Sequence, residues 1–476
     1  MPKEEIVQFA KKVLATAPDR MNSYRKDADG ILLHPRELFF KANEYLNNFF
    51  EGERENRWML IPGLRGTGKT TMLAQVYGML REKDVPQENI VYLSVDELVK
   101  IFRSNLSEFL EAYESIIGMP LESLKDKIFL LFDEIHYDKN WDSILKILYD
   151  KSKNVFIIAT GSSALALKTN PDAARRMLME RMFPLDFAEY LLLKQGMPNI
   201  EGLREKLDNA LFSSESASSA YSGLLAIKKE ANSYLLKIKP HELENYLLKG
   251  TLPFCFQLKQ EQAFERIKQM LEKVVYEDIQ SISLYDHETL DKIWNLLLIL
   301  SNSEKINLDS LASRLHLSKP TVYSMLKTLE KCEIIFSVPA FGSVSKQVRK
   351  SPKYCFLTPI IKVSLLWEMG KPVETSAMFG RMLEDIAAFY LYRHSITKKV
   401  SAISHDSEKG GADFIITSRS DNSKIAIEVG YGEKGERQAK QTMKKVKAKY
   451  GLIISDNPLS ISEDIVFVPK DLFLLA

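Results

Sequence analysis

Residues 63–70, Gly63-Leu64-Arg65-Gly66-Thr67-Gly68-Lys69-Thr70, decide the fold. They fit the pattern G-x-x-x-x-G-K-[ST] without a mismatch, between an apolar strand pattern, Trp58–Ile61, and a helical pattern, Thr70–Arg81. Glycines let the backbone wrap around phosphates with its N–H groups pointing inward, and the helix N-terminus adds positive partial charge. The sequence therefore predicts a nucleotide-binding loop made of Gly63, Arg65, Gly66, Thr67, Gly68, Lys69, Thr70 and Thr71.

A second motif is an apolar strand, Ile128–Phe132, that ends in Asp133 and Glu134. Carboxylates at the end of a buried strand are costly unless they meet a cation or water. We expect Thr70 and Asp133 to hold Mg²⁺ and Lys69 to contact the phosphates of ATP. Glu134 would then polarise the attacking water. The alternative is an Asp133 that only caps the next helix. The two motifs together predict an ATPase with ATP and Mg²⁺ as cofactors.

Further apolar runs predict the remaining strands of this domain. They are Ile90–Val95 and Val155–Ala159, with Met182–Leu185 as a fifth candidate. Short apolar strands that alternate with helices are typical of a parallel sheet with crossover helices. The fold class is therefore α/β, with a RecA-like core.

The strand order resembles that of the AAA+ group of P-loop ATPases, because one strand separates the two motifs and the next ends in Thr160-Gly161-Ser162-Ser163. The resemblance implies that this later strand lies between the first and third strands. It also implies that the hydroxyl of Ser162 or Thr160 contacts the γ-phosphate and the water. An arginine finger is implied as well, with Arg181 favoured over Arg175 and Arg176. The alternatives are a plain turn after the strand and local ion pairs for the arginines.

Later motifs are similar to those of the bacterial and archaeal AAA-type ATPases that carry a C-terminal domain of unknown function. The shared segments are Thr160–Ser163, Glu180-Arg181, Pro184–Tyr190, Tyr246–Pro253 and Val275–Ile279. The resemblance covers nearly the whole chain. This sequence departs from the family pattern at Glu180, Asp186, Thr251 and Glu277. The change at Glu180 puts the arginine finger in doubt.

The middle of the chain predicts a helical linker and then a winged helix. Leu308–Leu315 and Pro320–Cys332 have the pattern of a helix-turn-helix, with Ser318 as the helix cap. A basic tip, residues 345–353, lies between the two strands that follow. The candidate DNA contacts are Lys319, Thr321, Tyr323, Lys327, Lys346, Arg349 and Lys350. The alternative is a winged helix that packs against protein.

The last segment resembles the restriction-endonuclease-like fold. Glu384 lies in a helical pattern, Asp413 opens the strand Phe414–Thr417, and Glu428 lies in the strand Lys424–Val429. In that fold the carboxylates hold Mg²⁺ and a lysine follows the last one. Here Gly430 replaces the lysine, and Lys440 is the candidate substitute. A nuclease fold without efficient cleavage is the expectation, and an active ATP-regulated nuclease is the alternative.

The segment Arg437–Lys449 contains six basic residues and no acidic one. Such a helix suits a DNA backbone, and an ordinary solvated face is the alternative. DNA is therefore a candidate partner, and a nucleotide-dependent switch that binds a protein is the competing function. The oligomeric state, monomer or homo-oligomer, is left open.

Composition bounds these interpretations. A chain of 476 residues, with 45% hydrophobic and 27% charged residues, predicts several globular domains. We assign them to residues 1–50 (helical), 51–195 (ATPase core), 196–285 (helical linker), 286–357 (winged helix) and 358–476 (nuclease-like). Cys255, Cys332 and Cys355 lack ligand spacing, and no signal peptide or membrane span is predicted. We expect a cytoplasmic protein.

Overall fold

The computed structural model describes residues 4–162, 170–282, 285–303, 307–343, 345, 347, 350–397, 399–419 and 421–476. The chain forms two compact units, Met1–Phe183 and Pro184–Ala476. The finer division into five parts stays a prediction. None of the described helices is both long and apolar enough to cross a membrane. The three cysteines are free and buried.

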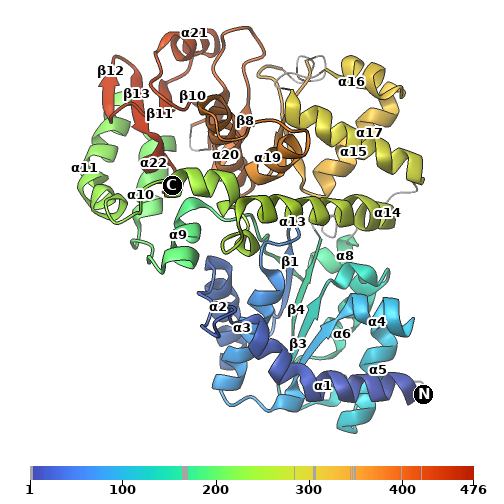
Figure 1. Ribbon diagram of the computed structural model, residues 1–476. Helices are drawn as coiled ribbons and strands as arrows, with labels where there is room; N and C mark the ends of the chain where they lie inside the picture. The colour runs from blue at the N-terminus through green and yellow to red at the C-terminus, as the bar shows by residue number, and fades with distance from the viewer. Residues whose placement is uncertain are drawn as a thin grey trace. The chain divides into compact units, whose positions relative to one another are not determined.

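The first unit alternates helices and strands along the chain (Figure 1). Its strands are β1 (Trp58–Pro62), β2 (Ile90–Ser94), β3 (Ile128–Asp133), β4 (Val155–Gly161) and β5 (Leu178–Met179). Its helices are α1 (Glu4–Tyr24), α2 (Glu37–Glu51), α3 (Lys69–Glu82), α4 (Val95–Phe102), α5 (Leu106–Ile117), α6 (Trp141–Lys151) and α8 (Pro171–Ala174). Short 3₁₀ turns, Gln87–Asn89, Leu121–Ser123 and Ile135–Tyr137, complete it.

The five strands form one sheet in the order β2-β3-β4-β1-β5, and the paired strands are all parallel. Strand β4 therefore lies between β1 and β3, as the resemblance implied. The predicted fifth strand at Met182–Leu185 was wrong, because the structure places β5 at Leu178–Met179. Met182 still donates its N–H to the Pro62 carbonyl, but Pro184 has no N–H to continue the ladder.

Alternate residues of the central strands pack on opposite faces of the sheet, as the period of a strand requires. On one face, Trp58, Leu130 and Ile157 pack against α4, α5 and α6. On the other face, Met59 and Leu131 pack with α2 and α3. Both faces are thus buried, which explains why these strands are continuously apolar.

The second unit begins with helices and ends in a mixed sheet (Figure 1). Its helices are α9 (Phe187–Gln195), α10 (Leu203–Phe212), α11 (Ala217–Leu235), α12 (Glu242–Asn245), α13 (Gln260–Lys273), α14 (Ile279–Ile282), α15 (His287–Asn302), α16 (Leu308–Leu315), α17 (Lys319–Lys331), α19 (Pro359–Glu368), α20 (Ser376–Ile396), α21 (Arg437–Val446) and α22 (Lys470–Phe473). Two π-helical turns, Tyr246–Gly250 and Val274–Asp278, and a 3₁₀ turn, Pro253–Cys255, lie among them.

The strands of the second unit form two sheets. Strands β6 (Ile335–Val338) and β7 (Lys353–Phe356) make an antiparallel pair. The larger sheet has the order β12-β13-β11-β10-β9-β8. Its strands are β8 (Val400–Ser404), β9 (Phe414–Ser418), β10 (Lys424–Val429), β11 (Tyr450–Ser455), β12 (Ser460–Ser462) and β13 (Ile465–Pro469). Strands β10, β11 and β13 are parallel and the others pair antiparallel.

Asp186, at the start of the second unit, is a buried carboxylate that caps a helix and forms two ion pairs. Its side chain is 1% exposed and caps α9 by accepting a hydrogen bond from Glu189 N at 2.8 Å. It also forms ion pairs with Arg204 and with Arg393, the latter at 2.5 Å. Burial opposes its charged form, but the two guanidinium groups outweigh burial and hold the pKa of Asp186 well below its ordinary value.

Two of the family-like segments meet within this unit. A Cβ on Gly250 would lie 2.6 Å from Cε2 of Tyr190, so this position has room only for glycine. The Tyr190 hydroxyl donates to Glu242 at 2.6 Å. These two segments, Pro184–Tyr190 and Tyr246–Pro253, therefore contact each other directly.

Candidate functional site

The phosphate-binding loop connects β1 to α3. Gly66 and Gly68 have φ angles of 83° and 98°, which favour glycine because a Cβ would be strained there. Lys69 is buried, and its Nζ donates to the carbonyls of Gly63 at 2.8 Å and Leu64 at 3.1 Å. Thr67 is also buried and closes the turn by donating to Leu64 O at 2.9 Å. The exposed Gly66 and the half-buried Arg65 and Thr71 complete the predicted set.

Gly63 gives a first prediction. A Cβ at this position would lie 2.4 Å from the backbone oxygen of Met182. Gly63→Ala therefore forces the loop to shift, and this overpacking costs about 1–3 kcal/mol of free energy. We expect nucleotide affinity to fall roughly tenfold or more, measured by titration with a fluorescent ATP analogue. Gly435→Ala, where a Cβ meets nothing within 4 Å, is the control. Equal affinity in the two variants would contradict the prediction.

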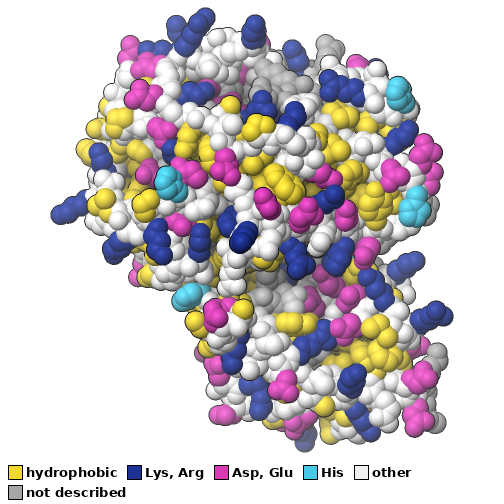
Figure 2. Space-filling view, in the orientation of Figure 1, with side chains coloured by type: hydrophobic (Ala, Val, Ile, Leu, Met, Phe, Trp, Pro, Cys, Tyr) yellow, Lys and Arg dark blue, Asp and Glu magenta, His cyan; other side chains and the backbone are white. Residues whose placement is uncertain are grey.

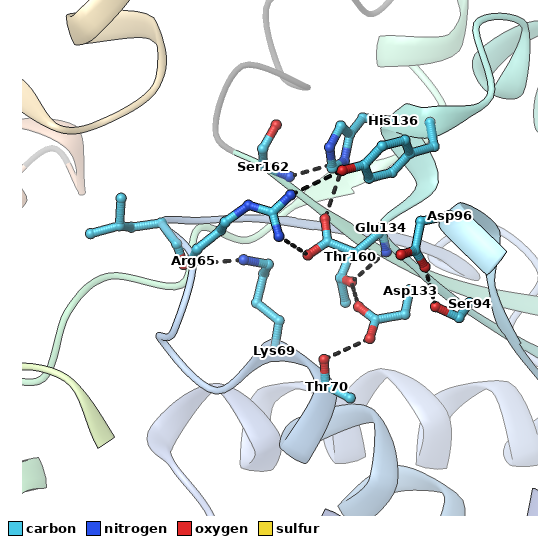
Figure 3. A network of polar contacts seen from close by, with 12 residues as sticks. Arg65, Lys69, Thr70, Ser94, Asp96, Asp133, Glu134, His136, Thr160 and Ser162 are labelled. Carbon is cyan, nitrogen blue, oxygen red and sulfur yellow. Dashed lines mark hydrogen bonds and ion pairs between the residues drawn. The ribbon is translucent and has the colours of Figure 1, made fainter. Parts of the chain in front are cut away.

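The carboxylate that ends β3, Asp133, lies against the start of α3. Thr70 Oγ1 donates to Asp133 Oδ2 at 2.6 Å (Figure 3). Asp133 is 4% exposed, and burial next to Glu134 raises its pKa, while Thr160, Thr70 and Lys69 oppose the rise. A hydroxyl and a carboxylate at this distance are oxygen ligands of the kind that Mg²⁺ takes. The residues present therefore fit the predicted metal.

Of the two hydroxyl candidates on β4, Thr160 is the one that contacts the carboxylate. Its Oγ1 donates a hydrogen bond to Asp133 Oδ1. The same atom accepts a hydrogen bond from Glu134 N at 3.4 Å. Ser162 instead contacts His136, to whose Nδ1 it donates its backbone N–H at 3.3 Å (Figure 3). The geometry thus favours Thr160 over Ser162, and the sensor role stays a prediction for both.

Glu134 lies near Arg65 of the loop and near His136, which the sequence analysis did not select. Its Oε1 is 3.8 Å from Arg65 NH1, and its Oε2 is 3.3 Å from His136 Nδ1. Arg65 also donates to the Tyr137 hydroxyl at 3.1 Å. Because His136 Nδ1 accepts a hydrogen bond from Ser162 N, it has no proton to offer Glu134 in that tautomer. Among the described residues Oε2 of Glu134 is buried and has no hydrogen-bond donor.

The candidate arginine fingers differ in their surroundings. Arg176 pairs with Asp150 at 2.6 Å, and Arg175 is exposed. The Arg181 guanidinium lies 6.0 Å from the centre of the Phe183 ring. Its neighbour Glu180, which replaces the family's glycine, pairs with Lys41 at 2.5 Å. The finger stays a prediction for Arg181.

Arg36, just before α2, is another residue that sequence reasoning missed. It donates to the carbonyl of Thr67 in the loop at 2.7 Å and to that of Phe183 at 3.0 Å. No local pattern marks such a contact, because it joins backbone atoms far apart in the sequence. His136 and Tyr137 had a weaker signal, since they follow the carboxylate pair directly.

The helix-turn-helix elements form where the sequence predicted them. Helix α16 is Leu308–Leu315, and Ser318 caps α17 by accepting from Thr321 N at 3.3 Å. The predicted shared core is buried: Leu311, Leu315, Val322, Met325, Leu326 and Leu329.

The candidate DNA contacts have mixed surroundings. Tyr323 is 52% exposed. Lys319 pairs with Asp309, and Lys327 pairs with Glu330 at 2.6 Å. Thr321 exchanges a hydrogen bond with Ser318 at 2.8 Å, and Lys350 is exposed. Lys346 and Arg349 lie outside the described residues. The winged-helix interpretation stays a prediction.

Glu384, Asp413 and Glu428 come from α20, the segment before β9, and β10. Asp413 accepts from Val429 N at 2.9 Å, which places it beside Glu428. A lysine from β7, Lys353, reaches the group: its Nζ forms an ion pair with Glu384 and lies 4.0 Å from Asp413 Oδ1. The three carboxylates and Lys353 form what we call the carboxylate cluster.

The substitute lysine predicted from the sequence was wrong. Lys440 pairs with Glu436 at 2.6 Å and Glu463 at 3.0 Å, because its place on α21 turns it toward those carboxylates. Lys434, in the loop after β10, lies 3.2 Å from Glu428 Oε1 instead.

Burial and Lys353 act in opposite directions on the carboxylates of this cluster. Burial and the nearby Glu384 raise the pKa of Asp413 to about 8, although Lys353 opposes the rise. Burial opposes ionisation of Glu384, but Lys353 outweighs it and lowers the pKa of Glu384. Among the described residues no group of three or more His, Cys, Asp or Glu side chains could hold a metal ion. The residues as arranged do not fit the Mg²⁺ of the nuclease fold.

Comparison with known families supports the two halves separately. Residues 55–191 match the family model described as AAA domain. Residues 240–366 match a domain of unknown function, DUF8612.

The parallel sheet, the loop between β1 and α3, and the carboxylate pair at the end of β3 therefore define an ATPase-like domain of the AAA class. Over 436 residues the chain is 39% identical to the "Uncharacterized protein MJ1637" of Methanocaldococcus jannaschii. The match covers 91% of this chain and 87% of that protein. The chain belongs to the same family as MJ1637.

Solved structures also match. The Thermotoga maritima RuvB Holliday junction branch migration motor is 17% identical, with a TM-score of 0.29, over 66% of this chain and 93% of RuvB. AMPPCP-bound DnaA from Aquifex aeolicus is 15% identical, with a TM-score of 0.27, over 65% of this chain and 92% of DnaA.

Proposed function

We propose that the protein binds ATP with Mg²⁺ and hydrolyses it in the first unit. The observation that carries this proposal is the contact between Thr70 and Asp133 at 2.6 Å, beside a Glu134 oxygen that has no donor among the described residues. Thr70 and Asp133 supply metal ligands, and Glu134 supplies a base. This combination is what phosphoryl transfer to water requires.

The geometry supports the following roles. The Lys69 ammonium group exchanges its two loop carbonyls for phosphate oxygens. Bound Mg²⁺ supplies positive charge to the phosphate oxygens. Glu134 Oε2 accepts a hydrogen bond from the attacking water and orients it. Thr160 keeps Asp133 in place through its hydroxyl. Arg181 would act on a nucleotide in a neighbouring copy if the protein assembles.

We also propose that the second unit contacts double-stranded DNA. Helix α21 presents Arg437 and Lys444, which are seven residues apart and therefore two turns along one face. Both are exposed, and neither has an ion pair among the described residues. Figure 2 shows Lys and Arg side chains standing out along the edge of the unit where α21 lies. Such a face suits the phosphate backbone.

The DNA proposal predicts a specific loss. Arg437→Glu with Lys444→Glu should weaken binding to duplex DNA at low salt and reduce the slope of log affinity against log salt by about 2. ATP turnover that DNA stimulates in the native chain should lose this stimulation. Fluorescence anisotropy across a salt series measures binding, and phosphate release measures turnover.

The control makes the same change in charge elsewhere: Lys11→Glu with Lys12→Glu on α1, where both lysines are exposed. DNA binding that falls equally in both variants contradicts the proposed face. Absence of DNA binding at low salt, with and without ATP, would contradict the proposal that the protein associates with DNA.

A nucleotide-dependent switch that binds a protein is the second candidate. The observation that favours it is that part of the positive charge on α21 and just after it is neutralised by carboxylates. Lys440, Lys445 and Lys449 are each paired with nearby carboxylates. ATP turnover that is slow and indifferent to DNA would favour this function. The lysine-paired carboxylate cluster gives no support to an active nuclease.

A further inference from the structure

A groove with an apolar floor lies in the first unit, between α5 and α6 (Figure 1). Its volume is about 330 Å³. The buried side chains of Leu110, Leu121 and Leu148 form the floor, and Ile147, which also lines the groove, is 55% exposed. Apolar side chains that gather around a concave surface are typical of a site that a partner covers.

The rim of this groove is acidic. Glu111 and Glu114 of α5 and Glu122 of the 3₁₀ turn that follows line it, and Lys151 is the only cation among the described lining residues. Lys151 pairs with Glu122 at 3.4 Å, whereas Glu111 has no ion pair among the described residues. Negative charge around an apolar floor favours a partner that carries both apolar and cationic side chains. An amphipathic helix with lysines beside its apolar residues meets this requirement.

Helix α11 of the second unit presents such residues on its outer face. Its inner face is buried and packs on α10, β12 and β13. On the opposite face, Leu225 is 48% exposed and Leu236, directly after the last residue of the helix, is 87% exposed. These two leucines are eleven residues apart, which is about three turns or roughly 16 Å along one side of a helix. Lys229 and Asn232 lie between them on the same side, and both are exposed. We call these four residues the α11 stripe.

The α11 stripe is basic. Residues 225–239 contain four lysines and one acidic residue, Glu230. Glu230 pairs with Lys206 at 3.2 Å, whereas Lys229 has no ion pair among the described residues. Folding therefore leaves positive charge without a counter-ion beside two leucines that the described part of the second unit leaves exposed. The stripe thus has the two properties that the groove requires.

We propose that the α11 stripe of one copy docks into the α5–α6 groove of another copy, so that the protein assembles head to tail. The leucines of the stripe cover Ile147 and the apolar floor, and Lys229 lies among the carboxylates of the rim. Because the groove and the stripe are different surfaces, a dimer keeps one unoccupied groove and one unoccupied stripe and can grow further. The contact spans about two helical turns and its charges are exposed, so we expect weak association that added salt reduces.

Sedimentation velocity over a series of chain concentrations at low salt, without nucleotide, tests this proposal. The native chain should self-associate. Ile147→Asp disrupts the groove and Leu236→Asp disrupts the stripe, so each variant alone should remain a monomer. An equal mixture of the two variants should form a dimer that grows no further, because one intact stripe then meets one intact groove. Ile101→Asp on α4 is the matched control, because Ile101 is 69% exposed and lies outside the groove, and it should associate like the native chain.

The charges of the two surfaces provide a second test. Glu111→Lys should weaken self-association roughly tenfold, because it places a lysine against Lys229 of the other copy. Adding Lys229→Glu to the same chain should restore the native affinity, since the two charges are then exchanged. A purely local effect of either substitution would not be rescued by the other.

Three results would overturn the proposal. They are a native chain that stays monomeric at every concentration, self-association that survives Ile147→Asp or Leu236→Asp, and an equal mixture of these two variants that stays monomeric. The first result would leave the groove to a partner other than a second copy. Circular dichroism checks that the variants fold, as substitutions at exposed positions should. Hydrolysis of ATP is not part of the readout, so the result is independent of the proposed ATPase.

Discussion

Glu134→Gln is expected to abolish ATP turnover while leaving ATP binding intact. The amide has the size of the carboxylate but cannot accept a proton, so the attacking water loses its base. The expected fall in kcat is about 10²- to 10⁴-fold, measured by phosphate release. Because Lys69, Thr70 and Asp133 are untouched, the affinity for a fluorescent ATP analogue should change little.

The control for this variant is Glu97→Gln on α4. Glu97 pairs with Arg20 at 2.5 Å and has no role in the proposed chemistry. Turnover in this control should equal that of the native chain. If Glu134→Gln retains native kcat, another group activates the water. If it loses ATP binding as well, Glu134 has a structural role in the loop.

Asp186→Ala is expected to destabilise the second unit by about 3–5 kcal/mol. The substitution removes a carboxylate oxygen that pairs with both Arg204 and Arg393, and it also removes the cap of α9. Removing one partner of a buried ion pair is strongly destabilising. Urea unfolding followed by circular dichroism should show a lower midpoint. Glu230→Ala is the matched control in the same unit, because Glu230 pairs with Lys206 at 3.2 Å on the surface. This pair should contribute less than about 1 kcal/mol.

The same carboxylate predicts a dependence on pH. The folded state holds the pKa of Asp186 below its ordinary value, which is about 3.9 in an unfolded chain. Its contribution to stability is therefore complete above that value and is lost as pH falls toward the folded pKa. Native and Asp186→Ala chains should thus converge in stability below about pH 4. A difference that stays constant from pH 7 to pH 3 would contradict this assignment.

The parts of the fold predicted from sequence are those that local chemistry determines. The loop at 63–70 needs its glycines and lysine at fixed spacing, and the strand before Asp133 needs to be apolar on both faces. Helices α16 and α17 were predicted from the cap at Ser318 and from apolar residues at helical spacing. In each case the deciding residues are neighbours in the sequence.

The parts that were missed depend on contacts between distant segments. Lys353 was included only in a basic tip, but it lies in a strand and faces Glu384, 31 residues later. Lys440 was chosen because it follows β10 on the next helix, and the direction of its side chain was not visible from the sequence. Thr160 and Ser162 are two residues apart, and only the sheet register shows which one meets Asp133.

The hydrogen bonds of Lys69 bear on which anions the loop selects. In the described structure two of the three N–H donors of this ammonium group bond to Gly63 O and Leu64 O. An anion that takes more than one hydrogen bond from this lysine must therefore replace a bond to the loop. An anion with a single phosphate gains little from that exchange, whereas a triphosphate contacts the rest of the loop at the same time. The loop should consequently discriminate against inorganic phosphate without any side chain devoted to excluding it.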